Sequence, residues 1–142
     1  QPAIAAYESG RKSPTLRTLT RIAGALGFEL IVGFVPPLTR EDRRSLALHR
    51  AVAAKLEADP VNVLDKARTN LRVMRDRHAH ARVLLNEWKM ILDRTVEEIV
   101  EVLLDPGTRA RELRHVTPFA GVLSAEERAQ VYGEFRATEV RR

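Results

Sequence analysis

Apolar residues recur at intervals of three and four along most of this chain, which is the spacing of one face of an α-helix. The clearest early case is Leu16, Leu19, Ile22 and Leu26. A Ser-Pro-Thr sequence precedes this stripe, and Gly27 follows it. A hydroxyl residue and a proline favour the start of a helix, and glycine favours its end, so this stretch is predicted to be one helix.

A shorter helix is predicted just before it. Ile4, Tyr7 and Glu8 stand at i, i+3 and i+4 and form a stripe on one side. Gly10 can take the left-handed conformation in which helices often end. Residues 1–27 are therefore predicted to form two short helices joined by a turn centred on a glycine.

Beyond Pro37 the same spacing predicts a region made only of helices. Capping-box patterns, in which a hydroxyl residue is followed three positions later by an acid, mark helix starts at Thr39, Thr95 and Ser124. The predicted helices, caps included, span residues 39–59, 60–74, 83–92, 95–104, 108–115 and 124–136. The polar residues 75–82 are predicted to be a frayed helix end and connection, and residues 137–142 a loose tail.

Residues 28–35 depart from the helical pattern. They are rich in β-branched and aromatic side chains, and Pro36-Pro37 ends them. We expect a lone strand that pairs with the same strand of a second subunit to give a homodimer. A helical extension is the alternative, because short apolar runs fit both structures. The side chains assigned to this dimer interface are Phe28, Leu30, Ile31, Val32 and Phe34.

The predicted fold class is mainly α, with three parts. Residues 1–27 are the helical pair, residues 28–38 are a dimerisation strand and linker, and residues 39–142 are an all-helical bundle. The linker ends at a double proline, which holds the chain extended, and the sequence after it is more highly charged.

The composition excludes several classes of protein. The chain has no cysteine, which excludes disulfide scaffolds, thiolate metal sites and cysteine nucleophiles. Its net charge of +5 indicates anionic partners. No apolar run approaches the roughly 20 residues needed to span a bilayer. We therefore expect a cytoplasmic protein without a membrane partner.

No cluster of residues predicts catalysis or a metal site. His78 and His80 are two positions apart, which places them on different sides of a helix. Glu97, Glu101 and Asp105 recur every four residues, and a solvated helix face accounts for them. We expect no enzyme activity, no metal and no cofactor.

The apolar loop 117–123 would be costly to leave in water. It either closes the end of the helical bundle or docks a partner protein. In the second case the partner-binding residues are Phe119, Val122 and Leu123.

Residues 1–27 resemble the C-terminal half of an Xre/Cro-type helix-turn-helix domain. They carry Gln-x-x-Ile, then Tyr-Glu-x-Gly, then a basic turn with a proline, then Leu-x-x-Ile-Ala-x-Ala-Leu-Gly. The resemblance implies two preceding helices that this sequence does not contain. It places Gln1 at base edges and Arg17 at a phosphate. The residues assigned to DNA are Gln1, Pro2, Ala3, Ala5, Ala6, Ser9, Arg11, Lys12 and Arg17.

This resemblance implies a homodimeric, nucleoid-associated transcriptional regulator that binds a double-stranded DNA operator. A helix-turn-helix part followed by a helical region is similar to the antitoxins of type II toxin–antitoxin modules. That similarity implies a repressor of its own operon with a toxin protein as partner. The alternative is an Xre-type repressor whose helical region binds a small-molecule effector or serves only in oligomerisation.

Overall fold

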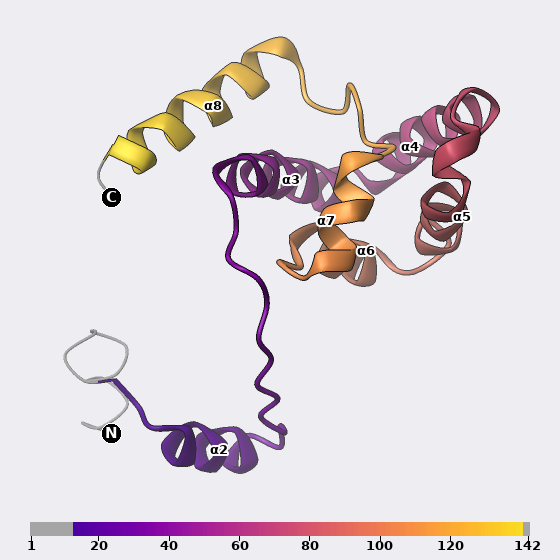
Figure 1. Cartoon of the computed structure of the whole chain (residues 1–142). Coiled ribbons are helices and arrows are strands. Elements are labelled where there is room, and N and C mark those ends of the chain that lie inside the picture. Colours follow the sequence, from indigo (N-terminus) through magenta and orange to yellow (C-terminus); the bar gives the residue numbers. More distant parts are fainter. Residues whose placement is uncertain (1–12, 141–142) are drawn as a thin grey trace. The chain divides into compact units, whose positions relative to one another are not determined.

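The computed structural model describes residues 13–140, without the side chain of Ala79. The chain divides into two compact units, residues 1–34 and residues 35–142. The boundary falls inside the predicted linker range 28–38. Figure 1 labels the helices of both units.

The first unit contains helix α2, Leu16–Ala25. It begins where the side chain of Thr15 accepts a hydrogen bond from the Thr18 N–H, at 3.2 Å. It ends in a Schellman motif, because the Phe28 N–H donates to the Ala23 carbonyl at 2.8 Å and the Gly27 N–H to the Gly24 carbonyl at 3.1 Å. Gly27 has a φ of 78°, so the predicted helix and its glycine stop are confirmed.

The predicted dimerisation strand is wrong. Within residues 13–140 there is no strand, and residues 28–39 have no regular secondary structure. The residues assigned to the interface, Phe28, Leu30, Ile31, Val32 and Phe34, lie in this irregular segment, and Phe34 is 100% exposed. A β-branched composition measures fit to a pleated surface more than an intrinsic backbone preference. The described part of the chain offers no second strand, so the backbone of the segment has no ladder to join there.

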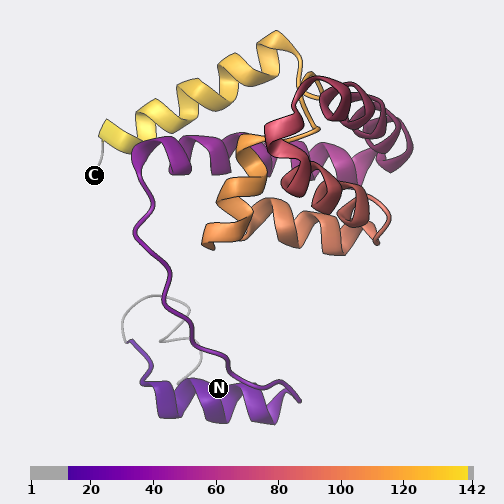
Figure 2. The same cartoon turned by 45° about the vertical axis from the view of Figure 1, so that its right-hand side comes forward.

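The second unit is helical from Arg40 onward. Its elements are α3 (Arg40–Ala58), α4 (Pro60–Arg77), the 3₁₀ turn η1 (Ala79–Ala81), α5 (Arg82–Ile91), α6 (Val96–Leu104), α7 (Thr108–His115) and α8 (Ala125–Val140). Helix α3 is central, with α6 and α8 both packed against it, and α4 lies beside α5 (Figures 1 and 2). The mainly α part of the predicted fold class is confirmed.

The predicted caps determine where the helices of this unit begin. Capping boxes form between Thr39 and Asp42 and between Thr95 and Glu98. The Ser124 hydroxyl and the Glu127 side chain exchange the same pair of hydrogen bonds with each other's backbone. Each cap satisfies backbone N–H groups that the first helical turn leaves unpaired, which stabilises the helix by about 1 kcal/mol.

Two predicted ends were too early. Helix α4 continues to Arg77, and α5 already begins at Arg82, so only His78 and η1 form the connection. Helix α8 continues to Val140, so residues 137–140 are not a loose tail. Polar composition misled both predictions, because arginine and glutamate have high helix propensity and continue a helix that is already formed.

The core is centred on Trp88, whose side chain is fully buried. Its indole N–H donates to the Leu113 carbonyl at 2.9 Å, and its ring meets Phe119 edge to face at 5.7 Å. Leu56, Leu85 and other aliphatic residues from α3 to α7 complete this core.

Helix α8 is attached differently from the others. None of its 16 residues is fully buried. Lys55 and Glu127 form an ion pair at 2.8 Å, as do Arg43 and Glu139. The Arg44 guanidinium lies 5.9 Å from the centre of the Tyr132 ring. Polar and cation–π contacts to α3 therefore account for much of its attachment.

Candidate functional site

Most of the residues assigned to DNA lie outside the described part of the chain. These are Gln1, Pro2, Ala3, Ala5, Ala6, Ser9, Arg11 and Lys12. Arg17 is described, and it lies on the exposed surface of α2. Arg21 is one helical turn further along and is also exposed. Neither forms an ion pair among residues 13–140, so both guanidinium groups of α2 face solvent.

The apolar side of α2 has little cover. Leu16 is 61% exposed and Leu26 is 68% exposed, while Leu19, Ile22 and Ala23 are half-buried. Helix α2 thus combines a cationic side with an uncovered apolar side.

The loop assigned to a partner protein lies in the core instead of on the surface. Phe119 is 2% exposed, and Val122 and Leu123 are buried beside it. The Asn70 side-chain amide donates to the Pro118 and Ala120 carbonyls, each at 2.8 Å, so α4 holds the loop in place. This arrangement corresponds to the alternative in which the loop closes the bundle.

The residues considered for metal binding do not converge. Within the described residues there is no group of three or more histidine, cysteine or acidic side chains arranged to hold a metal ion. His78 and His80 meet edge to face at 5.7 Å and are exposed. Glu97, Glu101 and Asp105 lie on the exposed side of α6 and its end.

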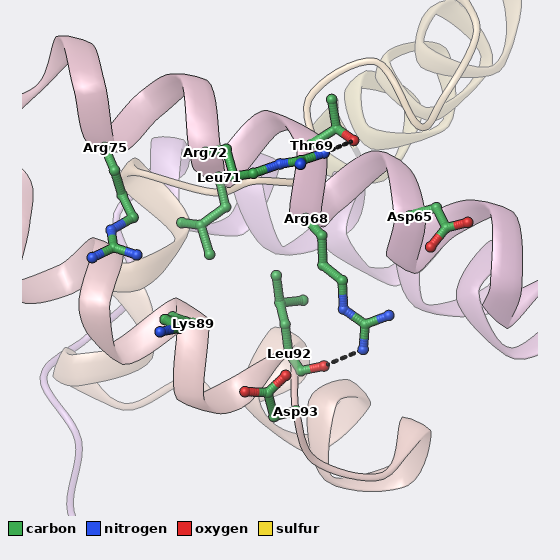
Figure 3. A pocket seen from close by; sticks show the side chains of 9 residues that line it. All are labelled: Asp65, Arg68, Thr69, Leu71, Arg72, Arg75, Lys89, Leu92 and Asp93. Carbon is green, nitrogen blue, oxygen red and sulfur yellow. Dashed lines mark hydrogen bonds between the residues drawn. The ribbon is translucent and has the colours of Figure 1, made fainter.

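A cleft of about 590 Å³ lies between α4 and the end of α5. Its size is within the range of small-molecule sites, roughly 300–1,000 Å³. Figure 3 shows Arg68 and Arg75 extending from α4 toward α5, with Lys89 and Asp93 on the α5 side. The residues that line it are Asp65, Arg68, Thr69, Leu71, Arg72, Arg75, Lys89, Leu92 and Asp93.

Two of the cleft's arginines are held in position. The Arg68 guanidinium donates to the Leu92 carbonyl at 3.0 Å, which ties α4 to the end of α5. The Arg72 guanidinium donates to the Thr69 hydroxyl at 3.2 Å on its own helix. Each bond uses one N–H of a group that has five, so further donors remain for a ligand.

The cations of the cleft have no carboxylate partner. Six ion pairs are present among residues 13–140, and none includes Arg68, Arg72, Arg75 or Lys89. Asp65 and Asp93 also line the cleft but form no ion pair with these groups. Four cations against two carboxylates leave the lining with a net charge of +2.

A second hollow continues the cleft along α4. Its volume is about 500 Å³, and its lining residues are Arg72, Arg75, Asp76, Arg82 and Asn86. It shares two arginines with the first cleft, so the cationic surface is continuous.

Sequence reasoning missed this cleft. Cations three and four positions apart on one helix, Arg68, Arg72 and Arg75, were a usable signal. The contribution of Lys89 and Asp93 depends on how α5 packs against α4, and periodicity alone does not give that packing.

A second unusual polar feature of the helical unit is a pair of buried side chains. His49 and Arg114 are both buried, and His49 Nε2 and Arg114 Nη2 have no hydrogen-bond partner. The Nδ1–H of His49 donates to the Ser45 carbonyl at 2.8 Å. Burial lowers the pKa of His49 below its ordinary value, the bond to Ser45 opposes this shift, and the Arg114 charge adds to it. The neutral form of His49 is therefore favoured in the folded state.

Within residues 13–140, no helix combines the length and the apolarity needed to cross a membrane. Comparison with known proteins gave no match to a family model, to a curated protein or to a solved structure.

Proposed function

We propose that this chain is a DNA-binding transcriptional regulator of the Xre type. The observation that carries the proposal is helix α2, which follows the predicted family pattern through its Gly27 stop and presents Arg17 and Arg21 to solvent. Arginines on an exposed helix contact phosphates readily, because the guanidinium group donates two parallel hydrogen bonds.

Base reading is assigned to residues ahead of α2. Gln1 stands where the resemblance places base contacts, and a glutamine side chain pairs bidentately with adenine N6 and N7. The proposal therefore includes a preference for an A·T pair at one operator position. Homodimerisation stays a prediction without strand pairing to support it, and the symmetry of the selected DNA sites tests it.

Selection of duplexes from a random-sequence library tests the DNA-binding proposal. The expected result is an enriched site at which Gln1→Ala relaxes the preference for one A·T pair. Arg17→Gln should weaken binding to all sequences alike, because phosphate contacts carry no sequence information. The proposal fails if the chain enriches no sequence and its binding does not depend on salt.

For the helical unit we propose effector binding ahead of toxin binding. The open cleft between α4 and α5 favours a ligand, whereas the residues assigned to a partner protein, Phe119, Val122 and Leu123, are buried. Co-purification with the product of a neighbouring gene tests the antitoxin role. Capture of a toxin whose activity the chain suppresses would favour that role over effector binding.

A further inference from the structure

We propose that the cleft between α4 and α5 binds a small molecule bearing a phosphate group. The inference rests on the effector-binding part of the proposed function and is independent of the DNA-binding part. The sequence pattern assigns none of Arg68, Arg72 or Lys89 to a ligand, and Arg75 belongs to the basic stretch 75–82, for which an anionic-partner contact is the alternative to a solvated surface.

The cleft is short of negative charge. Its four cations form no ion pair within the described chain, although other arginines and lysines of the same unit, such as Arg43, Lys55 and Arg109, do. The net charge of +2 on its lining matches a phosphate monoester, which carries about −1.5 to −2 at neutral pH.

The geometry favours phosphate over a single carboxylate. Arginines fix the position of planar or tetrahedral oxyanions by donating paired hydrogen bonds. Arg68, Arg72 and Arg75 follow one another along α4, and Lys89 lines the cleft from α5, below Arg75 in Figure 3. A group with several acceptor oxygens can be approached from both helices, whereas one carboxylate has only two oxygens.

The backbone that carries the cations is held by buried side chains. Leu71 and Leu92, which line the cleft, are buried in the core. The bond from Arg68 to the Leu92 carbonyl holds one guanidinium across the gap. Arg68 and Arg72 therefore lose little side-chain freedom on binding, and this loss is a main cost of recognising a small ligand.

The acidic residues limit what can fit. Asp65 lies before the first arginine of this row on α4 and Asp76 after the last, so a carboxylate flanks the row at each end on α4, while the second hollow adds Arg82 of α5. At 1.5 Å per residue the row from Arg68 to Arg75 is about 10 Å long. A compact anion fits between these carboxylates, whereas a nucleic-acid strand running along α4 would carry its phosphates past them.

Titration calorimetry on the complete chain tests this inference. The probes are inorganic phosphate and phenyl phosphate at pH 8, with ionic strength held constant by chloride. The expected result is saturable binding of one phosphate per chain. The double variant Arg75→Gln/Lys89→Gln should weaken it at least tenfold. Both residues are exposed and unpaired among residues 13–140, so the fold should survive, which near-UV circular dichroism of Trp88 verifies.

The matched control is Arg50→Gln/Arg136→Gln, which removes the same charge from exposed positions on α3 and α8 that form no ion pair with any described residue. It should bind phosphate as the parent does. The inference is overturned if the parent binds no phosphate, or if both double variants lose binding equally.

Competition with duplex DNA of arbitrary sequence tests whether the cleft binds the nucleic-acid backbone instead. If it displaces bound phosphate, and the Arg75→Gln/Lys89→Gln variant loses DNA affinity, the cleft is a contact for the nucleic-acid backbone and the inference is wrong. If the parent binds phosphate but no DNA, the cleft assignment stands while the DNA-binding proposal fails.

Discussion

Helix α2 and the cleft between α4 and α5 are both cationic, and they differ in what lies beneath their charges. The arginines of α2 are carried by a helix with no fully buried residue. Those of the cleft are carried by helices whose other sides reach into the core around Trp88. Exposed charges on a lightly packed helix suit a long polyanion, which supplies many weak contacts. Charges on a rigid support suit a small ligand, which supplies few.

Removing the core beneath the cleft should have the largest effect. Trp88→Ala is expected to lower the free energy of unfolding of the helical unit by about 3–5 kcal/mol, because it leaves a cavity and deletes the hydrogen bond to Leu113. Urea unfolding followed by far-UV circular dichroism measures this change.

The matched change in the other region is Leu16→Ala, where the side chain is 61% exposed. It is expected to shift the same free energy by less than about 0.5 kcal/mol. If the two substitutions had similar effects, the contrast in support between α2 and the cleft would be lost.

The helix caps give a smaller and more local contrast. Thr95→Ala should lower the free energy of unfolding of the helical unit by about 1 kcal/mol, because it removes the capping box that starts α6. Thr15→Ala removes the corresponding bond at α2 and should leave the free energy of unfolding of the helical unit unchanged. Near-UV circular dichroism at the single tryptophan follows the helical unit alone, so an equal response to both changes would contradict the division into two units.

The pH dependence of stability should come from the helical unit. Because burial lowers the pKa of His49, the unfolded state binds more protons below pH 6.5, and stability falls as pH drops from there toward the lowered pKa. Below that pKa the contribution of His49 is constant. Asp42 and Glu127 also have lowered pKa values, through hydrogen bonds from Thr39 and Lys55 respectively, and add their losses only at more acidic pH.

Urea unfolding between pH 8 and pH 5 measures the His49 effect. A His49→Gln variant should lack the decline just below pH 6.5, whatever its stability at pH 8. A decline that persists in that variant would assign the pH dependence to another group.

Much of the helical unit was predictable because local chemistry decides it. The hydroxyl and acid pairs beginning at Thr39, Thr95 and Ser124 start helices where they were expected, since capping acts within one turn. Helix α7 spans Thr108–His115 as predicted.

The features that could not be predicted depend on contacts between different elements, which the periodicity of one element does not reveal. The segment 28–35 has a strand's composition, but a strand forms only where another strand pairs with it. The cleft combines Lys89 of α5 with Arg72 and Arg75 of α4, and no spacing within either helix reveals that combination. Phe119 is a different case. The sequence left open whether this loop residue binds a partner or closes the bundle, and its burial against Trp88 corresponds to the second alternative.

The most direct test uses two double variants of surface residues, which should change stability least of all the substitutions above. Two double variants remove equal charge, Arg17→Gln/Arg21→Gln from α2 and Arg75→Gln/Lys89→Gln from the cleft, and neither should unfold the chain. Affinity for duplex DNA is measured across a salt series for both. The account predicts that the α2 variant loses affinity and reduces the slope of log affinity against log salt by about 1.8, because two phosphate contacts are lost. The cleft variant should keep the slope of the parent. A cleft variant that loses as much as the α2 variant would contradict the account.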